Sequence, residues 1–499
     1  MRDHLVTYFE THHKLVEADA LALLLETTQP LAVCRRILRR ADDDSPFITR
    51  TMVEGAIAQL ALERGGTAVA LRPGDPLPEI RPPPPPYELV REGYSAAPPG
   101  RAPLEAYSAL FHSRFETLAR LLRGRPGLPN LRPVAELRGQ EGSASMIGMV
   151  REVRQTQEKH HIILTLEDAS GALEALVVKD SPPAKVPYLP DEVLGVHLAV
   201  PKERGRIPRV VGVERPELPA GRPVHRAGRP SRVIFLSDLH IGSRSFMEDA
   251  WGQLVDFLHE RDAHAEIAHG IDHVVVAGDL VDGIGIYPNQ EKDLAITDVF
   301  EQYHELGRRL RELPERLNVV VVPGNHDAVG PAEPQPGLPP EIRASLPPNV
   351  RSIGNPSTFA LEGVVVEAYH GRSFDDLIPA IPGASYARPT EVMKRMLAMR
   401  HLGPIYGGRT PLAPLPRDGL VIDPAPDILV TGHAHTFGVD QYRGVLLLNA
   451  STWQAETEYQ RMRNITPIPA RAAVVNLADF TLEALDFSIP RPTARAVPA

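Results

Sequence analysis

The stretch VVVVPGNHDAVG, residues 319–330, joins four consecutive valines to a polar cluster. A run of valines is typical of a β-strand that is buried on both faces. Gly324, Asn325, His326 and Asp327 follow almost directly, although such residues gain little from burial in a core. The abrupt change indicates that the end of this strand serves chemistry rather than packing.

Four further apolar segments end in the same way: VIFLSDLH, HVVVAGDLVDG, VVVEAYHG and DILVTGHAHT. In open α/β folds, loops at the carboxyl ends of strands converge on one crevice, where side chains distant in sequence meet. Glycines before Asp279, Asn325 and His433 allow sharp turns at these loops. The five segments supply nine candidate site residues: Asp238, His240, Asp279, Asp282, Asn325, His326, His370, His433 and His435.

These residue types together predict a metal site. Carboxylate, imidazole and carboxamide groups suit Mn, Fe or Zn, and contain too much nitrogen for a dedicated Ca or Mg site. A single histidine near a strand end is more often a hydrogen-bonded loop residue than a ligand. Five occurrences, each directly after an apolar strand, reverse that preference.

The composition of the 499 residues, with 43% hydrophobic and 23% charged, is that of a globular protein with several domains. No apolar stretch approaches the roughly 18 residues that cross a bilayer, which excludes a membrane protein. The N-terminus does not resemble a secretory signal, and the single cysteine, Cys34, cannot form an intrachain disulfide. We therefore expect a cytoplasmic protein, whose net charge of −9 restricts any nucleic acid contact to local patches.

Periodicity divides the chain into parts and predicts a multidomain α/β fold. Helical spacing near the N-terminus, proline-rich stretches such as 82–86, and the alternating segment 162–177 mark the boundaries. The alternating segment suits an OB-type β-barrel. Such a barrel would either bind nucleic acid in a groove or only pack against the neighbouring domain. We expect a helical N-terminal domain at 1–70, a proline-rich linker at 71–133 with a helix around 103–123, an OB-type domain at 134–215, a linker at 216–230, a layered α/β domain at 231–490 and a flexible tail at 491–499.

The motifs D-x-H, G-D-x-x-D, G-N-H-D, a lone H and G-H-x-H resemble those of the calcineurin-like metallophosphoesterase superfamily. In addition, GDLVDGIGIYPNQE, PGNHDAVGPAEPQP, YHGRSFDDLI and HLGPIYGGRTPLAP resemble the small subunit of archaeal family D DNA polymerase, the proofreading exonuclease partner of a large polymerase subunit. The superfamily motifs cover residues 231–450, and the preceding third matches in domain order and composition. The resemblance implies a calcineurin-like phosphoesterase domain whose layered β-sheets are flanked by helices.

The resemblance also implies roles for the candidate residues. His326 would be the catalytic histidine, and Asp282 would orient it and favour its protonated form. Seven ligands would hold two divalent ions, with Mn preferred and Fe or Zn as alternatives: Asp238, His240 and His435 at the first, Asn325, His370 and His433 at the second, and Asp279 bridging both.

The expected activity is removal of nucleotides from a DNA 3′ end, a 3′–5′ exonuclease reaction in which a metal-activated hydroxide attacks the terminal phosphodiester. Arg372 and Arg409 would clamp phosphates or lie on the surface, and Tyr287 and Tyr406 would stack on a base or pack in their loops. The expected partners are the large polymerase subunit, DNA, and a sliding clamp or another replication factor, which places the chain at the nucleoid. A phosphoesterase acting on other substrates and a mainly structural subunit are the competing hypotheses.

Overall fold

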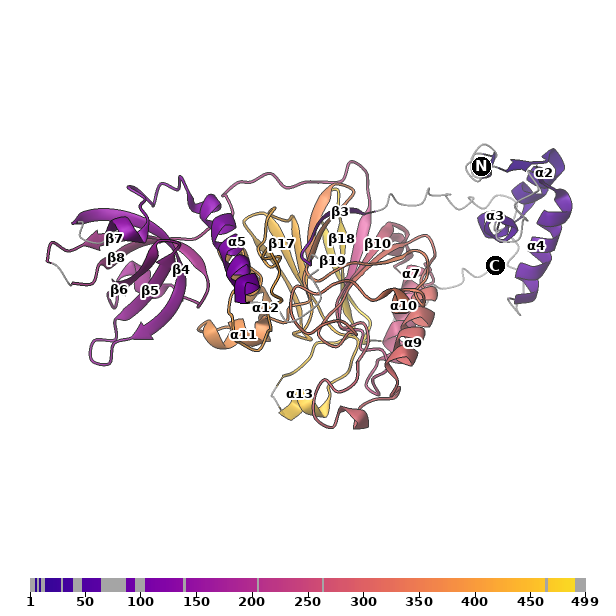
Figure 1. Ribbon diagram of the computed structural model, residues 1–499. Helices are drawn as coiled ribbons and strands as arrows, with labels where there is room; N and C mark the ends of the chain where they lie inside the picture. Colours follow the sequence, from indigo (N-terminus) through magenta and orange to yellow (C-terminus); the bar gives the residue numbers. More distant parts are fainter. Residues whose placement is uncertain are drawn as a thin grey trace. The chain divides into compact units, whose positions relative to one another are not determined.

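The computed structural model describes residues 5–6, 9, 14–27, 30–38, 47–63, 87–94, 104–137, 141–203, 206–262, 264–462 and 465–489 (Figure 1). The chain forms two compact units, Met1–Pro82 and Pro83–Ala499. The proline run 82–86 and the expected tail at 491–499 lie outside the described residues. In the described part of the chain, no helix is both long and apolar enough to cross a membrane.

The first unit has its own small core. Its elements are β1 (Leu15–Val16), α2 (Ala18–Glu26), α3 (Pro30–Leu38), β2 (Phe47–Ile48) and α4 (Arg50–Glu63), and β1 pairs with β2 in parallel. Leu24, Cys34 and Val53 are buried between the helices. Cys34 is thus a buried apolar residue, as its surroundings in the sequence suggest. Residues 64–70 of the expected helical domain lie outside the described part.

Two six-stranded sheets form the centre of the second unit. The first sheet has the order β12-β11-β10-β9-β18-β19, and the second has the order β16-β17-β15-β14-β13-β3. Their strands are β9 (Arg232–Leu236), β10 (Ile271–Ala277), β11 (Asn318–Val322), β12 (Val350–Ser352), β18 (Arg471–Asn476) and β19 (Leu482–Asp486), then β3 (Glu88–Glu92), β13 (Ser357–Leu361), β14 (Val364–Ala368), β15 (Ile428–Thr431), β16 (Phe437–Tyr442) and β17 (Val445–Ala450).

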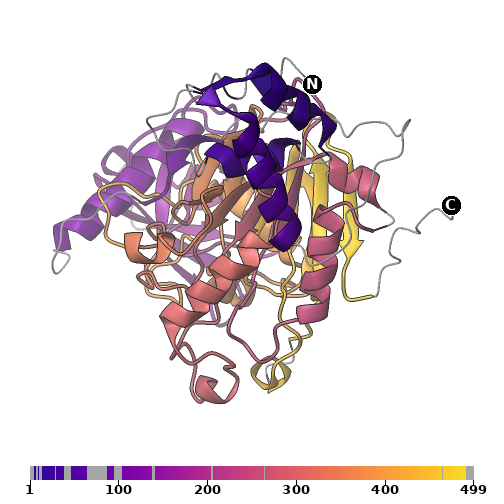
Figure 2. The same ribbon diagram turned by 90° about the vertical axis from the view of Figure 1, so that its right-hand side faces the viewer.

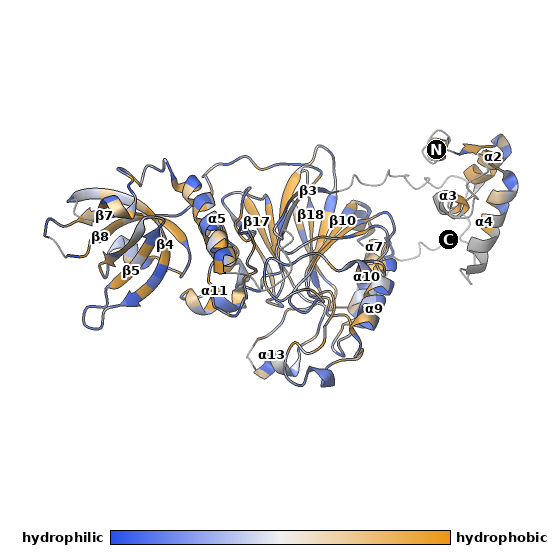
Figure 3. Ribbon diagram, viewed as in Figure 1, coloured by the Kyte–Doolittle hydropathy of each residue, from blue (hydrophilic) through white to orange (hydrophobic). Residues whose placement is uncertain are grey.

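The alternation of side chains along each strand explains why the sheets pack face to face. Val233 and Phe235 of β9 enter the core between the sheets, whereas Ile234 and Leu236 point to the opposite face. Since both faces of the central strands β9, β10 and β11 are covered, most of the residues in these strands are buried and apolar. Figure 3 shows hydrophobic residues concentrated along β17 and β18.

Helices cover the two outer faces. On the first sheet, α7 (Glu248–Leu258), α8 (Ala265–His269), α9 (Val299–Arg311) and α10 (Pro340–Arg343) contribute to one core, and these are the rose and salmon helices of Figure 2. On the second sheet, α11 (Phe374–Ala380) and α12 (Pro389–Met399) form another. The result is a mixed α/β architecture of four layers. The short elements α13 (Glu458–Met462) and η2 (Gln290–Lys292) lie in loops beyond the strand ends.

A closed five-stranded barrel lies between β3 and β9 in the sequence. Its order is β4-β5-β6-β8-β7, from β4 (Gly142–Gln155), β5 (Ile162–Asp168), β6 (Gly171–Val177), β7 (Val193–Val200) and β8 (Arg209–Glu214). The helix α6 (Val134–Leu137) adds two side chains to the barrel core, and η1 (Pro182–Lys185) lies between β6 and β7. The turn between β5 and β6 falls where the sequence predicts it, at 168–171. The OB-type classification stays a prediction.

The range 71–133, expected as a linker, contains two elements of the second unit. β3 pairs antiparallel with β13 and so completes the second sheet. α5 (Leu104–Leu122) coincides with the helix expected around 103–123. Arg114 of α5 is buried and donates to the carboxylate of Asp418 at 2.6 Å. This stretch therefore contributes to the folded core as well as connecting domains.

Candidate metal centre

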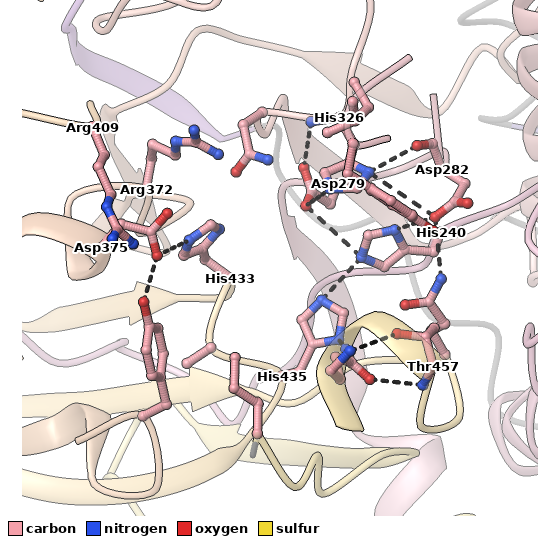
Figure 4. Close-up of a pocket in the computed structure, with 18 residues that line it drawn as sticks. His240, Asp279, Asp282, His326, Arg372, Asp375, Arg409, His433, His435 and Thr457 are labelled. Atoms are coloured by element: carbon pink, nitrogen blue, oxygen red, sulfur yellow. Dashed lines mark hydrogen bonds and ion pairs between the residues drawn. The ribbon is translucent and has the colours of Figure 1, made fainter. Parts of the chain in front are cut away.

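The candidate residues follow five strands whose carboxyl ends lie at one edge of the two sheets. β9, β10 and β11 are parallel neighbours in the first sheet, and β14 and β15 are parallel neighbours in the second. Because the sheets pack face to face, the loops after these strands meet. They surround a pocket of about 480 Å³ that is lined by His240, Asp279, Asn325, His326, His433 and His435, among others (Figure 4). Asp238 and His370 are fully buried beside it.

Of the three groups of these side chains that could each hold a cation, one is formed by His240, Asp282 and His326, and the other two correspond to the predicted sites. Of these two, one consists of Asp238, His240 and His435, and the other of Asp279, His370 and His433. Within each group the potential ligand atoms lie within 4.8 Å of one another. Asp279 of the second group also lies near the first, because its Oδ2 atom is 3.3 Å from His370 Nε2 and 3.8 Å from His240 Nε2. The Oδ1 atom of Asn325 is 3.1 Å from His370 Nε2.

Hydrogen bonds determine which imidazole nitrogen could bind a metal. His370 Nδ1 donates to the carbonyl oxygen of Ala277 at 3.0 Å, and His240 Nδ1 donates to the carboxylate of Asp282 at 2.9 Å. A neutral imidazole has one donor and one acceptor nitrogen, so in that form Nε2 is the acceptor of both residues. These Nε2 atoms face other predicted ligands, since His240 Nε2 is 3.0 Å from His435 Nε2 and His370 Nε2 is 3.1 Å from Asn325 Oδ1. His433 Nε2 donates to the carboxylate of Asp375 at 3.2 Å, so Nδ1 is the nitrogen of His433 that could bind a metal. These donor sets fit the predicted pair of divalent ions.

Close backbone packing explains the glycines beside the ligands. Gly278 has a positive φ of 93°, so it does form the expected sharp turn. Gly324 and Gly432 serve another purpose. A Cβ atom on Gly324 would lie 2.2 Å from Asp279 Oδ1, and one on Gly432 would lie 2.3 Å from Asp238 Oδ2. These two glycines allow the carboxylates to approach the neighbouring backbone.

The charges of the site favour bound cations. Burial opposes ionisation of Asp279, but His370, His326 and His240 lower the pKa of its carboxyl well below the usual value. Burial also opposes a charge on His370, yet Asp279 and Asp238 raise its pKa to about 9. The buried carboxylates therefore stabilise positive charge on their neighbours, as a metal-binding site requires.

His326 lies at the pocket, but its partner differs from the expectation. Its Nδ1 atom donates to the main-chain oxygen of Asp282 at 2.7 Å, whereas the carboxylate of Asp282 is 4.0 Å away. Burial lowers the pKa of His326, although Asp279 and Asp282 oppose the shift. The carboxylate of Asp282 is thus hydrogen-bonded to His240 instead, and His326 is held by the backbone.

Three of the four residues predicted to bind substrate line the pocket: Tyr287, Arg372 and Arg409. Within the described residues, neither arginine forms an ion pair. Tyr287 donates from its hydroxyl to Asp293 at 3.1 Å. Tyr406 is not part of the lining, and its ring packs against Tyr107 and Phe111 of α5, with ring centroids 5.3 and 5.4 Å apart.

Several pocket residues did not emerge from the sequence. Asp375, in the first turn of α11, accepts from His433 Nε2 and from the hydroxyl of Tyr386. Gln460 of α13 donates to His435 Nδ1 at 2.6 Å. Asp375 lies within YHGRSFDDLI, just beyond the lone histidine, so its position near a ligand was the available signal. Gln460 has no comparable signal, because no apolar strand precedes it.

Comparison with known proteins identifies the family. A family model that describes the B subunits of DNA polymerases alpha and epsilon matches residues 233–439. The DNA polymerase II small subunit of Archaeoglobus fulgidus is 42% identical over 377 residues, which cover 74% of this chain and 75% of that protein. The chain belongs to the family of DNA polymerase II small subunits. Another small subunit, from Methanothermobacter thermautotrophicus, is 40% identical over 388 residues, covering 76% of this chain and 79% of its own length.

Membership in the DNA polymerase II small subunits confirms the resemblance to the small subunit of archaeal family D DNA polymerase. Among solved structures, one described as a novel archaeal phosphodiesterase matches 51% of this chain and 98% of its own length, at 10% identity and a TM-score of 0.27. A likeness this weak adds no argument about activity. The residues of its own pocket are therefore the basis for any proposal about the chemistry of this small subunit.

Proposed function

We propose that this chain is the 3′–5′ exonuclease subunit of a replicative DNA polymerase and that it acts with a large polymerase subunit. The observation that supports the proposal is the meeting of two potential cation sites in one open pocket, with Asp279 belonging to one site and lying 3.8 Å from His240 of the other. Two adjacent cation sites of this kind are typical of enzymes that hydrolyse phosphoesters. Family membership supports the polymerase partner, and DNA is the corresponding phosphodiester substrate.

Two divalent ions, when bound, would lower the pKa of a water molecule and offset negative charge on the phosphoryl oxygens. The residues around the ions have separate tasks. Because Nδ1 of His326 donates to the Asp282 carbonyl, Nε2 is the nitrogen left for the substrate, and in the protonated imidazole it carries the proton that the oxygen of the leaving sugar would accept. Arg372 and Arg409 lie on the same side of the pocket as His433 in Figure 4, where they would bind the phosphates of the strand.

Replacement of the Asp279 carboxylate tests the proposal. Asp279→Asn should reduce nuclease activity to near zero, because the amide weakens binding at both cation sites. The measurement is the rate at which the complex with the large subunit digests end-labelled, mismatched DNA in the presence of Mn. Glu174→Gln, on the exposed surface of the barrel, is the control and should retain the wild-type rate.

The competing hypotheses predict other results. A mainly structural subunit would leave the nuclease activity of the complex unchanged in Asp279→Asn. A phosphoesterase with another substrate would hydrolyse a small chromogenic phosphodiester and leave DNA ends intact. Either result would contradict the exonuclease proposal.

A further inference from the structure

Asp282 uses its two polar groups for two different histidines. Its Oδ1 atom accepts from His240 Nδ1 at 2.9 Å, and its main-chain oxygen accepts from His326 Nδ1 at 2.7 Å. The carboxylate therefore accepts a hydrogen bond from His240, a candidate metal ligand. The backbone oxygen accepts one from His326, the candidate catalytic histidine. Figure 4 shows Asp282 beside both rings.

Two glutamines hold this arrangement. Gln454 donates from Nε2 to Asp282 Oδ1 at 3.1 Å and to the hydroxyl of Ser243 at 2.8 Å. Gln290 donates from Nε2 to the main-chain oxygen of Asp282 at 2.8 Å. Asp282 is only 1% exposed, so its carboxylate has little freedom to turn toward His326. The hydrogen bonds thus fix the carboxylate on His240.

We infer that Asp282 is a positioning residue of the first cation site, acting through His240 rather than through His326. A carboxylate that accepts the far N–H of a ligating imidazole sets its orientation and strengthens it as a ligand, and loss of such a partner weakens metal binding about 10- to 100-fold. The inference rests on the metal pair of the proposed function. It does not depend on the identity of the substrate.

The two possible roles of Asp282 predict different measurements. If the carboxylate supports His240, its removal weakens cation binding at one of the two sites. If it orients His326, its removal slows hydrolysis and leaves cation binding unchanged. Metal affinity, measured without any substrate, therefore separates them.

The experiment is calorimetric titration of the full-length chain with Mn. Asp282→Ala should weaken one of two binding events about 10- to 100-fold and leave the other near its wild-type affinity. Asp282→Asn keeps an oxygen at the same place but removes the charge, so it should weaken the same event by a smaller factor. If Asp282→Ala does not fold, the Mn affinity of Asp282→Asn alone distinguishes the two roles.

Asp418→Asn is the matched control. Asp418 is buried and accepts from His401 Nε2 at 2.9 Å and from the buried Arg114 at 2.6 Å, but it touches no candidate ligand. It should bind Mn like the wild type. Wild-type affinity at both sites in the Asp282 variants would overturn the inference. A wild-type chain that binds two Mn ions and, with its large subunit, spares DNA ends would instead overturn the proposed function and leave this inference standing.

Discussion

At the scale of single residues, the backbone of the ligands is as informative as their side chains. Five of the seven predicted ligands have left-handed backbone angles: Asp238 (φ 51°), His240 (φ 49°), Asp279 (φ 48°), His433 (φ 62°) and His435 (φ 55°). Such angles are uncommon outside glycine and cost on the order of 1–3 kcal/mol each. The surrounding fold must therefore impose them, and local sequence alone would not predict them.

Gly432 gives a prediction at this scale. In Gly432→Ala, the new Cβ atom would lie 1.8 Å from Ser237 Oγ and 2.3 Å from Asp238 Oδ2, so Asp238 has to move. We expect a loss of about 1–3 kcal/mol in the free energy of unfolding and weaker Mn binding. Urea unfolding and Mn titration measure the two effects.

Gly252→Ala provides the comparison for that variant. Gly252 lies in α7, and a Cβ atom there meets nothing within 4 Å. Alanine should raise stability by about 0.5–1 kcal/mol and leave Mn binding unchanged, because alanine is the better helix former. Equal Mn affinity in both alanine variants would contradict the packing argument.

The site residues that the sequence could predict share one property, which is that each follows an apolar strand. That signal found all seven proposed ligands together with Asp282 and His326. It could not find Asp375, because this residue begins a helix. It also could not show that the Asp282 carboxylate contacts His240, since that contact joins loops 42 residues apart.

At the scale of elements, predictions succeeded where periodicity was long and failed where it was short. α5 has apolar residues at helical spacing and lies where expected. β3 was missed because its five residues are mostly exposed and show no clear alternation. Its place in the sheet depends on the edge that β13 presents, which is a property of the folded molecule.

Contacts between elements also hold the barrel to the layered domain. Glu192, just before β7, accepts from Arg215 and from Arg395 of α12 at 3.2 and 2.9 Å. The side chain of Glu192 is 0% exposed, and both arginines are 11% exposed. The loss of one member would leave buried charges without a partner.

Glu192→Ala should therefore reduce the free energy of unfolding by about 3–5 kcal/mol. Urea unfolding followed by circular dichroism measures the change. Glu174→Ala removes the partner of Arg154 in an exposed pair on the same barrel, and its cost should be below about 1 kcal/mol. Similar losses in the two variants would show that burial does not determine the contribution of Glu192.

At the scale of the whole molecule, the chain divides into a small helical unit and a large unit that contains the site. The core of the first unit is formed by its own residues, such as Leu24 and Val53. The second unit begins before β3, whose Arg91 donates to the buried Glu367 at 3.1 Å. A shortened chain should therefore keep its full stability only if it begins before β3.

A chain of residues 83–499 should fold, bind Mn and keep the unfolding transition of the second unit. A chain of residues 104–499 should unfold at a lower temperature, because it lacks β3 and leaves Glu367 without Arg91. Scanning calorimetry of both chains measures the difference. Identical transitions would mean that β3 contributes nothing to the stability of the second unit.

The position of β18 has a consequence for biosynthesis. This strand, Arg471–Asn476, is placed between β9 and β19, so the strand that leads to Asp238 has β10 on one side and gains its second neighbour only from residues 471–476. The first sheet, at whose edge the candidate metal centre lies, is therefore complete on this side of β9 only after residue 476 has been translated.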